Sequence, residues 1–388
     1  MKLFEEANVR FYASEKNLNT KKGFVFYNPL MRINRDFSVL ILRALQEFKN
    51  RKLNVLELMS ASGIRALRIA LQADAKSLVV NDISRECFEA TIKNFEMNNL
   101  REDERIRFYN MDANMLLLKS KSFDYIQIDP FDDVHKFIEL SLRRIKKNGI
   151  LAITTTDTAT LSGTYPKTCM RRYCSRPLHE DFNHEFGIRI LIKDLQTIAA
   201  KKNILLKPLI SYHYKHHYGL FFSAEKSKKK SDFVFEKHNY LLYCKNCCNR
   251  KITDHVFSKM VLFNRNECDF CGSEFNYFGS FYSGQLCEQE LLLEMKRIYE
   301  RTERAGDETI SKETKKYLDV LIDENRIEIP FTFNTHLLAK KHKLKLLPLD
   351  KIIEKLKESR FKASRTHFDN TSLRTDARLN ELLSIMKG

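Results

Sequence analysis

The chain has 388 residues and a formal net charge of +17, with 43% hydrophobic and 30% charged residues. The length suggests two domains, and the composition excludes an intrinsically disordered chain. A positive charge of this size favours a polyanionic partner such as nucleic acid. No apolar run reaches the ~18 to 20 residues that span a bilayer, and the start lacks the apolar core of a secretory signal. Together with nine cysteines, these features predict a cytosolic protein with reduced thiols and a metal site.

Strand-like and helix-like segments alternate from Leu53 onward. Short apolar runs predict strands over residues 53–58, 77–83, 106–113, 123–130 and 150–157. Helical spacing of apolar residues covers residues 62–72, 84–100, 134–149 and 184–203. Residues 204–214 and 217–225 predict a closing antiparallel pair. The alternation is typical of an α/β fold, a Rossmann-like parallel sheet with helices on both faces. Ligands of such sheets bind at the carboxyl ends of the strands, where four acids fall: Asp82, Asp112, Asp129 and Asp157.

The first strand–helix junction, "LELMSASGIRALRIA", predicts a cofactor loop in which Gly63 suits a tight turn before a helix. Asp82 ends the next strand, roughly 20 residues on, where a carboxylate can bind both hydroxyls of a ribose. Asp112 ends the third strand and can accept a hydrogen bond from an adenine amine. The chain has neither a GxGxxG motif nor a P-loop, so the remaining candidate is an adenosine cofactor without phosphates, S-adenosylmethionine (AdoMet). The alternative is that these acids only cap helices.

The fourth strand ends in "IDPF", residues 128–131. An exocyclic base amine is a poor nucleophile because its lone pair is delocalised into the ring. The carboxylate of Asp129 can accept one N–H of such an amine and direct the lone pair at the methyl group of AdoMet. Pro130 restricts Asp129 to an extended conformation, and Phe131 offers a flat face on which an extruded base can stack. The alternative is an ordinary Asp-Pro turn after a strand.

Two cysteine pairs predict a metal site. Cys244 and Cys247 form one Cys-x-x-Cys knuckle, and Cys268 and Cys271 form a second. This spacing is typical of a four-thiolate structural zinc site, which has no open position for water. Cys248 adjoins the first knuckle, and the sequence leaves open whether it takes part.

A lysine-rich run at residues 224–231, "AEKSKKKS", predicts a solvated linker that divides the chain. We expect a catalytic α/β domain over residues 1–225, within which residues 1–50 form a segment on the substrate side. Residues 226–388 then form a smaller α+β domain that carries the zinc site and contacts RNA.

Two further groups of residues are candidates for contact with RNA. Residues 161–177 combine basic and aromatic side chains beside the expected site. Three histidines lack metal spacing and favour a packing or RNA-facing role; they are His213, His216 and His217.

Several separated motifs resemble the tRNA guanine-26 N2-dimethyltransferase family. They are "VFYNPLMRINRDFSV", "SASGIRALR", "DPF", "TTTDTATLSG", "HEFGIRILI" and "SRTHF", and they match in order and in character. The resemblance implies a class I AdoMet-dependent methyltransferase domain followed by a smaller family-specific domain. It also implies that the protein methylates the N2 amine of guanine at position 26 of tRNA, once and then a second time.

The resemblance further implies roles for individual residues. AdoMet would be bound by Arg35, Ser60, Gly63, Arg65, Asp82, Asp112 and Ala113. Asp129 would be the catalytic acceptor, Pro130 and Phe131 would shape the base pocket, and Phe26 or Tyr27 is a candidate for its opposite wall. The late motif "SRTHF", residues 364–368, becomes a candidate RNA contact.

Three positions depart from the family pattern, as does the segment "YKHHYGLFF", residues 214–222, where the family's usual polar residues are replaced. Asp132 stands where glycine usually follows Asp-Pro-Phe, Glu57 replaces an aspartate, and Ser62 replaces a threonine. We expect these residues to tune the site, with the second methylation most affected. Two other functions stay open: a non-catalytic RNA-binding zinc protein, and an amino-methyltransferase acting on another guanine or on DNA. We expect a monomer without an obligatory protein partner.

Overall fold

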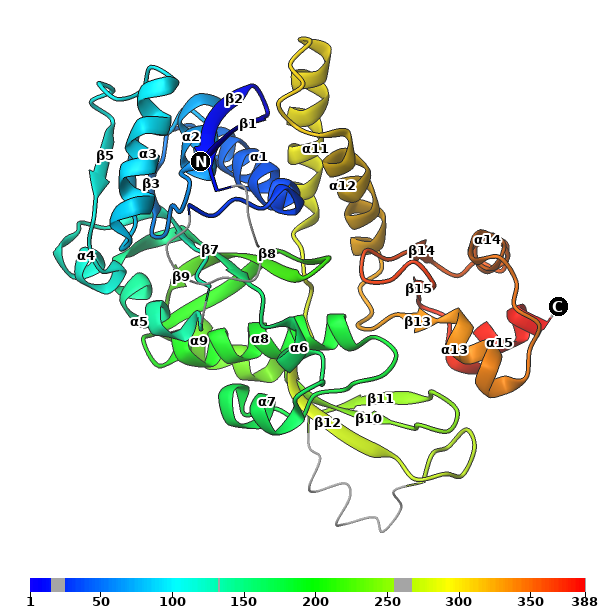
Figure 1. The fold of residues 1–388 in the computed structure, drawn as a ribbon. Helices are drawn as coiled ribbons and strands as arrows, with labels where there is room; N and C mark the ends of the chain where they lie inside the picture. The colour runs from blue at the N-terminus through cyan, green and yellow to red at the C-terminus, as the bar shows by residue number, and fades with distance from the viewer. Residues whose placement is uncertain (15–24, 132, 255–266, 388) are drawn as a thin grey trace.

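The computed structural model describes residues 1–14, 25–131, 133–254 and 267–387. Its centre is a seven-stranded sheet in the order β5-β4-β3-β6-β7-β9-β8 (Figure 1). The pairs from β5 to β7 are parallel, and β9 is antiparallel to β7 and β8. The strands are β3 (Asn54–Glu57), β4 (Ser77–Asn81), β5 (Ile106–Tyr109), β6 (Phe123–Ile128), β7 (Ile145–Thr155), β8 (Ile204–Tyr214) and β9 (His217–Lys226). The predicted parallel sheet with a closing antiparallel pair is confirmed.

Helices cover both faces of this sheet. In Figure 1, α1 to α3 lie on one side of it and α5 and α8 on the other. All six residues of β6 are buried, as expected for a strand packed between two helical layers. The helices of this region are α1 (Arg32–Lys49), α2 (Ile64–Gln72), α3 (Arg85–Met97), α4 (Ala113–Lys119), α5 (His135–Arg144) and α8 (Asn183–Ala200), with the 3-10 turn η1 (Pro29–Met31) before α1.

The helix predicted over residues 134–149 is shorter than expected. It ends at Arg144, and the chain turns into β7 at Ile145. Lys146 donates a hydrogen bond to Asp124 at 3.0 Å, and the side chain of Ile145 is buried. These contacts with β6 stabilise an extended chain where the apolar spacing alone also fits a helix.

Two segments rich in basic residues contain helices. The lysine run does not form a solvated linker, because β9 extends through Lys226 and α9 (Lys228–Asp232) follows, with Ser227 as its N-cap. The helix buries Ser231 and leaves its lysines exposed. Residues 161–177 contain α7 (Pro166–Tyr173), which follows the short helix α6 (Thr158–Leu161). The basic side chains of both segments are exposed, and an RNA contact at residues 161–177 stays a prediction.

The remaining elements flank the central sheet. A hairpin of β1 (Lys2–Glu6) and β2 (Val9–Ala13) precedes α1. A second sheet, in the order β11-β10-β12, carries the cysteines, and a third has the order β13-β15-β14. These later elements are η2 (Phe233–Lys237), β10 (His238–Tyr243), β11 (Arg250–Thr253), β12 (Asn276–Tyr282), α11 (Gln289–Arg304), α12 (Lys312–Asn325), β13 (Phe333–Asn334), α13 (Thr335–His342), α14 (Leu349–Glu358), β14 (Ala363–Arg365), β15 (Ser372–Thr375) and α15 (Leu379–Lys387).

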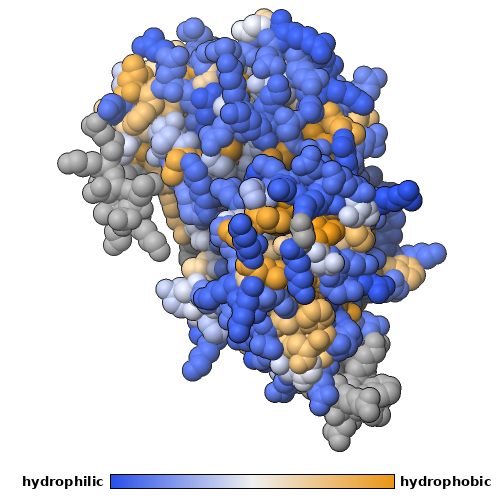
Figure 2. All heavy atoms as spheres, turned by 90° about the vertical axis from the view of Figure 1, so that its right-hand side faces the viewer, coloured by the Kyte–Doolittle hydropathy of each residue, from blue (hydrophilic) through white to orange (hydrophobic). Residues whose placement is uncertain are grey.

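The carboxyl-terminal half packs closely against the central sheet and its helices. Helix α11 lies along α1, and β12 lies along α8. The face formed by the last elements is covered mostly by hydrophilic side chains, with apolar patches between them (Figure 2). Every helix within the described ranges is too short or too polar to cross a membrane.

Candidate active site

A pocket of about 330 Å³ lies at the carboxyl ends of β3, β4 and β6. The strand order reverses between β3 and β6, and open α/β sheets bind their ligands at this switch point. Nine of the ten residues predicted to bind AdoMet or to act in catalysis line this pocket: Arg35, Ser60, Arg65, Asp82, Asp112, Ala113, Asp129, Pro130 and Phe131. The convergence follows from the parallel sheet, which brings distant strand ends to one edge.

Gly63 is the one predicted residue that does not line the pocket. It is the N-cap of α2 and has a φ of +77°. A Cβ atom at this position would lie 2.9 Å from Cγ2 of Thr91. Glycine is therefore needed for the left-handed turn and for the close approach of α3, and it acts on the cofactor loop indirectly.

Asp82 and Asp112, the acids predicted to hold adenosine, each bond to the backbone as well as lining the pocket. Asp82 accepts hydrogen bonds from the amides of Ala61 at 2.8 Å and Ser84 at 2.9 Å. Burial raises the pKa of Asp82, although these bonds oppose the rise. Asp112 caps α4 by accepting from the amide of Met115 at 3.0 Å. Asp112 therefore does cap a helix, as the alternative interpretation proposed. Both Asp82 and Asp112 also line the pocket and have further lone pairs that can accept hydrogen bonds.

Arg65 is bonded to the predicted catalytic carboxylate. Its Nη2 donates to Oδ2 of Asp129, and its Nη1 lies 3.5 Å from Oε1 of Glu57. Burial raises the pKa of Glu57 to about 8, although Arg65 opposes the rise. The guanidinium therefore links the ends of β3 and β6, where sequence reasoning assigned it only to the cofactor.

A buried polar chain holds Arg65 in place. Its Nη2 donates to Oδ1 of Asn34 at 2.7 Å, and Nδ2 of Asn34 donates to the Tyr212 hydroxyl at 2.8 Å. Sequence reasoning missed Asn34 and Tyr212. The available signal was an amide in the otherwise apolar face of the helix that begins "RINRDF".

Glu6 anchors Arg35, the other arginine of the pocket. Nε of Arg35 donates to Oε1 of Glu6 at 2.7 Å, and the Tyr27 hydroxyl donates to Oε2 at 3.1 Å. Burial opposes ionisation of Glu6, but Arg35 and Arg68 outweigh it and lower the pKa of Glu6 to about 2. The amino-terminal hairpin therefore supports the pocket through Glu6, a contact that no local sequence pattern predicts.

Two aromatic rings meet at the mouth of the pocket. Phe131 is 60% exposed, and its ring centroid lies 4.9 Å from that of Phe26 at an interplanar angle of 90°. Tyr27, the other candidate for the opposite wall, packs inward on Phe11 at 4.8 Å. Phe26 is therefore the ring that faces Phe131. Asp132 lies outside the described residues.

The three histidines and Asp157, which were also singled out in the sequence, do not all reach the pocket. His216 lies in the turn between β8 and β9 and lines the pocket, whereas His213 and His217 are buried. Asp157 does not line the pocket, because its Oδ2 accepts from Arg172 at 2.9 Å and from the Tyr173 hydroxyl at 2.8 Å. Of the four strand-end acids, three converge and one is used for packing.

The four predicted metal ligands come together. One ligand atom from each of four cysteines lies within 4.8 Å of the others: Cys244, Cys247, Cys268 and Cys271. Two of the sulfur pairs are 3.5 and 3.6 Å apart. A tetrahedral ion with Zn–S bonds of ~2.3 Å needs sulfurs ~3.8 Å apart, so the group fits zinc closely. Cys248 is buried outside this group, next to Tyr243.

The motif "SRTHF" does not form an RNA contact at His367 and Phe368, so that prediction is wrong for these residues. The His367 side chain is 2% exposed, and its Nδ1 lies 2.6 Å from Oε2 of Glu324. Nη2 of Arg374 bridges Glu324 at 2.7 Å and Glu185 at 2.8 Å. The motif thus completes a buried ion network that ties α8 to α12 and β15.

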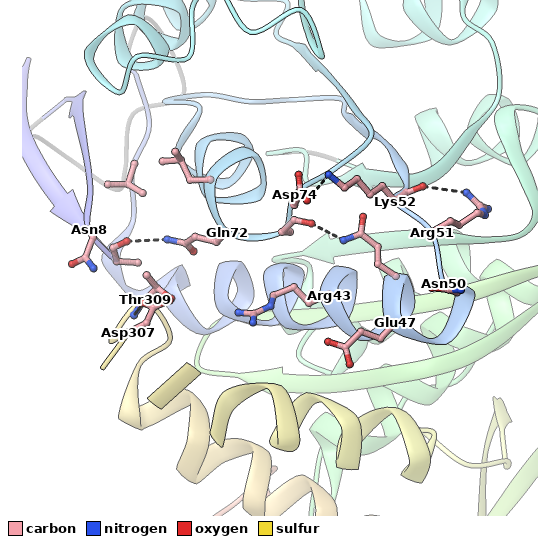
Figure 3. Close-up of a pocket in the computed structure, with 15 residues that line it drawn as sticks. Asn8, Arg43, Glu47, Asn50, Arg51, Lys52, Gln72, Asp74, Asp307 and Thr309 are labelled. Atoms are coloured by element: carbon pink, nitrogen blue, oxygen red, sulfur yellow. Dashed lines mark hydrogen bonds and ion pairs between the residues drawn. The ribbon is translucent and has the colours of Figure 1, made fainter. Parts of the chain in front are cut away.

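A second cavity, of about 760 Å³, lies between the amino-terminal hairpin, α1 and the end of α2 (Figure 3). Its polar side chains are largely paired with one another or with the backbone. Lys52 and Asp74 form an ion pair at 2.5 Å, and Nε2 of Gln72 donates to the carbonyl of Ala7 at 2.9 Å. Charges of both signs line this cavity without converging on a common point, so it is not the candidate site.

Comparisons with known proteins agree with this geometry. A family model described as N2,N2-dimethylguanosine tRNA methyltransferase matches residues 6–387. The chain is 39% identical over 366 residues to the tRNA (guanine(26)-N(2)/guanine(27)-N(2))-dimethyltransferase of Aquifex aeolicus, covering 94% of this chain and 90% of the relative. It is 32% identical to the tRNA (guanine(26)-N(2))-dimethyltransferase of Pyrococcus abyssi, covering 93% and 92%. The structure of Trm1 from Pyrococcus horikoshii with S-adenosyl-L-methionine has a TM-score of 0.84 at 25% identity over the whole of both chains.

Proposed function

The chain belongs to the N2,N2-dimethylguanosine tRNA methyltransferase family, and on that premise we propose how its pocket works and which guanine it serves. It is an AdoMet-dependent methyltransferase of the N2 amine of tRNA guanine. We place the target at position 26, modified once and then again. The observation that carries the assignment is Asp129, held by Arg65 at the switch point between the cofactor loop and an exposed aromatic ring.

The donor half of the pocket suits AdoMet, which supplies an electrophilic methyl group on a sulfonium. Asp82 would accept the ribose hydroxyls, because both of its oxygens are already oriented by backbone amides. Asp112 and Ala113 would face the adenine, and Ser60 would lie beside the ribose or the methionine moiety. Arg35, fixed by Glu6, would contribute positive charge near the carboxylate end.

Asp129 performs the proton chemistry. Its carboxylate accepts one N–H of the guanine amine, which turns the nitrogen lone pair toward the methyl carbon. AdoMet, when bound, would supply the methyl group, and the Asp129 carboxylate would take up the proton that the amine loses on methylation and release it to solvent. Arg65 fixes the direction of the Asp129 carboxylate, since Arg65 is itself held by Asn34. General base catalysis of this kind contributes about 10² to 10⁴ in rate.

Phe131 and Phe26 form the base-binding end. Their edge-to-face contact closes the mouth, so an entering guanine must separate the two rings. Stacking on aromatic rings contributes about 1 to 3 kcal/mol per base. That energy offsets part of the cost of extruding the base from the tRNA helix.

We propose that the four cysteines hold a structural zinc ion. The group joins the turn after β10 to the turn before β12, and α13 packs on it through His342, whose Nε2 lies 3.0 Å from the carbonyl of Cys247. The ion would keep this sheet positioned for contact with tRNA. A monomeric state and a cytoplasmic location stay predictions from the sequence.

The defining experiment is methylation of an unmodified tRNA transcript with AdoMet, followed by mass spectrometry of its nucleosides. We expect N2-methylguanosine and then N2,N2-dimethylguanosine, both lost when guanine 26 is replaced by adenine. Because the Aquifex relative is named for positions 26 and 27, a transcript with guanine only at position 27 tests that second candidate. Failure to form either nucleoside contradicts the proposed function.

A further inference from the structure

His216 lines the pocket, but the chemistry described above gives it no role. It belongs to the turn between β8 and β9, which brings it to the same pocket as Asp129 and Phe131. We propose that His216 reads the guanine base by donating a hydrogen bond from Nδ1 to O6. This inference rests on the proposed function, since it concerns the base whose amine meets Asp129.

The neighbour Asn28 fixes the proton position on the imidazole ring. Oδ1 of Asn28 accepts a hydrogen bond from the amide of Leu30 at 3.0 Å, which determines the orientation of the side-chain amide. Nδ2 of Asn28 therefore faces Nε2 of His216, 3.2 Å away. An amide nitrogen can only donate, so Nε2 must be the acceptor. The neutral ring consequently carries its proton on Nδ1 and presents a donor to any further partner.

A donor at this place suits guanine. The N2 amine and O6 flank N1 on the same edge of the base, so a pocket that holds the amine at Asp129 exposes O6 to a second group nearby. O6 is a hydrogen-bond acceptor, whereas adenine has a donor amine at the equivalent carbon. A neutral histidine with its proton on Nδ1 can donate a hydrogen bond to O6 of guanine but has no acceptor for the adenine amine. Asp129 would thus accept a hydrogen bond from the N2 amine, and His216 would donate one to O6 on the same edge of the base.

Nε2 of His216 faces Asn28, and the edge of the ring packs against His217 with the centroids 5.7 Å apart; neither contact uses Nδ1. His216 is exposed, in contrast to His217, which is completely buried. Lys215 in the same turn is also exposed and does not line the pocket. A Lys215→Gln variant therefore controls for general effects of changing this turn and its charge.

The test uses tRNA transcripts with guanine, 2-aminopurine or 7-deazaguanine at position 26. 2-Aminopurine keeps the amine but lacks O6, and 7-deazaguanine keeps both but lacks N7. We expect wild-type kcat/KM to be roughly 10- to 100-fold higher for guanine than for 2-aminopurine. In His216→Ala the value for guanine falls by a similar factor, the value for 2-aminopurine barely changes, and discrimination is lost. His216→Gln, which keeps an N–H donor, restores part of it, whereas Lys215→Gln behaves as wild type.

Two results overturn the inference while leaving the proposed function intact. One is an equal loss on guanine and 2-aminopurine in His216→Ala, which would assign the histidine to the RNA backbone. The other is sensitivity of the wild type, but not of the variant, to 7-deazaguanine, which would move the contact to N7. A wild-type enzyme that methylates none of the transcripts refutes the proposed function and this inference together.

Discussion

Asp129 faces the pocket and at the same time bonds to Arg65, whose other neighbours are Glu57 and Asn34. A buried guanidinium with two carboxylates and an amide around it has little freedom to move. Arg65 therefore fixes the direction in which the Asp129 carboxylate points, and Pro130 restricts the Asp129 backbone. Such preorganisation is what alignment of a weak amine nucleophile requires.

Asp129→Asn keeps the shape of the side chain but removes its charge and its capacity to take a proton. We expect turnover to fall about 10² to 10⁴-fold, with little change in affinity for AdoMet or tRNA. Single-turnover methyl transfer and filter binding measure the two effects separately. Asp157→Asn is the matched control, because Asp157 also ends a strand but bonds to Tyr173. Near-normal turnover in Asp129→Asn would refute its role as acceptor.

At this scale the sequence identified the acids of the pocket but not their partners. Asp82, Asp112 and Asp129 end parallel strands, and parallel strand ends share one edge of a sheet. The spacing of Arg65 shows only that it lies in the first turn of a helix. That its guanidinium reaches both Glu57 and Asp129 depends on the tertiary position of α2 at the ends of β3 and β6, which no local pattern encodes.

At the scale of elements, His135 ties the start of α5 to α8. Its Nε2 lies 2.6 Å from Oδ2 of Asp194, and its Nδ1 bonds to Asp133. Burial lowers the pKa of His135, but the two carboxylates outweigh it and raise the value from 6.5 to about 9. These contacts hold the segment that follows Asp-Pro-Phe.

The raised pKa of His135 gives stability a defined pH dependence. A protonated ring is favoured in the folded state, so its contribution is complete below pH 6.5 and is lost as the pH rises through about 9. We expect His135→Asn to lower the free energy of unfolding by roughly 1 to 3 kcal/mol at pH 6 and by much less at pH 9.5. Urea denaturation of both proteins at these two pH values tests this. An equal difference at both would show that titration of His135 plays no part.

The cysteine cluster should stabilise its own sheet first. The sulfurs of the four cysteines lie within 4.8 Å of one another, and a structural zinc ion at such a site contributes directly to folding. We expect a chelator to introduce an early calorimetric transition that zinc restores, while the main transition shifts less. Cys248→Ser is the control, since Cys248 lies outside the cluster. Superimposable melting curves with and without chelator would contradict a structural metal.

Helices and strands could be predicted where the spacing of apolar residues fits only one of the two. The parallel strands are short apolar runs between amphipathic helices, and knuckle spacing alone identified the four cysteines that come together. The lysine run was assigned to a linker because charge indicates exposure but not conformation, and α9 is exposed and helical. Similarly, the helix predicted over residues 134–149 was too long, because the contact of Lys146 with Asp124 is tertiary and leaves no local sequence pattern.

At the scale of the molecule, the charge of +17 and the hydrophilic carboxyl-terminal face (Figure 2) suit a large polyanion. We expect tRNA affinity to fall steeply with salt, with a logarithmic slope of about −0.7 to −0.9 for each phosphate contacted. AdoMet affinity, set inside the pocket, should change little and serves as the internal control. Binding titrations between low and physiological salt measure both. Salt-independent binding of tRNA would exclude a backbone-dominated interface.

Arg374 lies near the end of the chain, yet it neutralises Glu185 on α8, 189 residues earlier. Breaking a buried ion pair by removing one partner costs about 3 to 5 kcal/mol. During synthesis Glu185 and its neighbour Arg189, which pair at 2.8 Å, leave the ribosome long before Arg374 has been translated. A nascent polypeptide therefore cannot complete this ion network until Arg374 has left the ribosome, and until then Glu185 has only Arg189 of its own helix as a buried counter-ion.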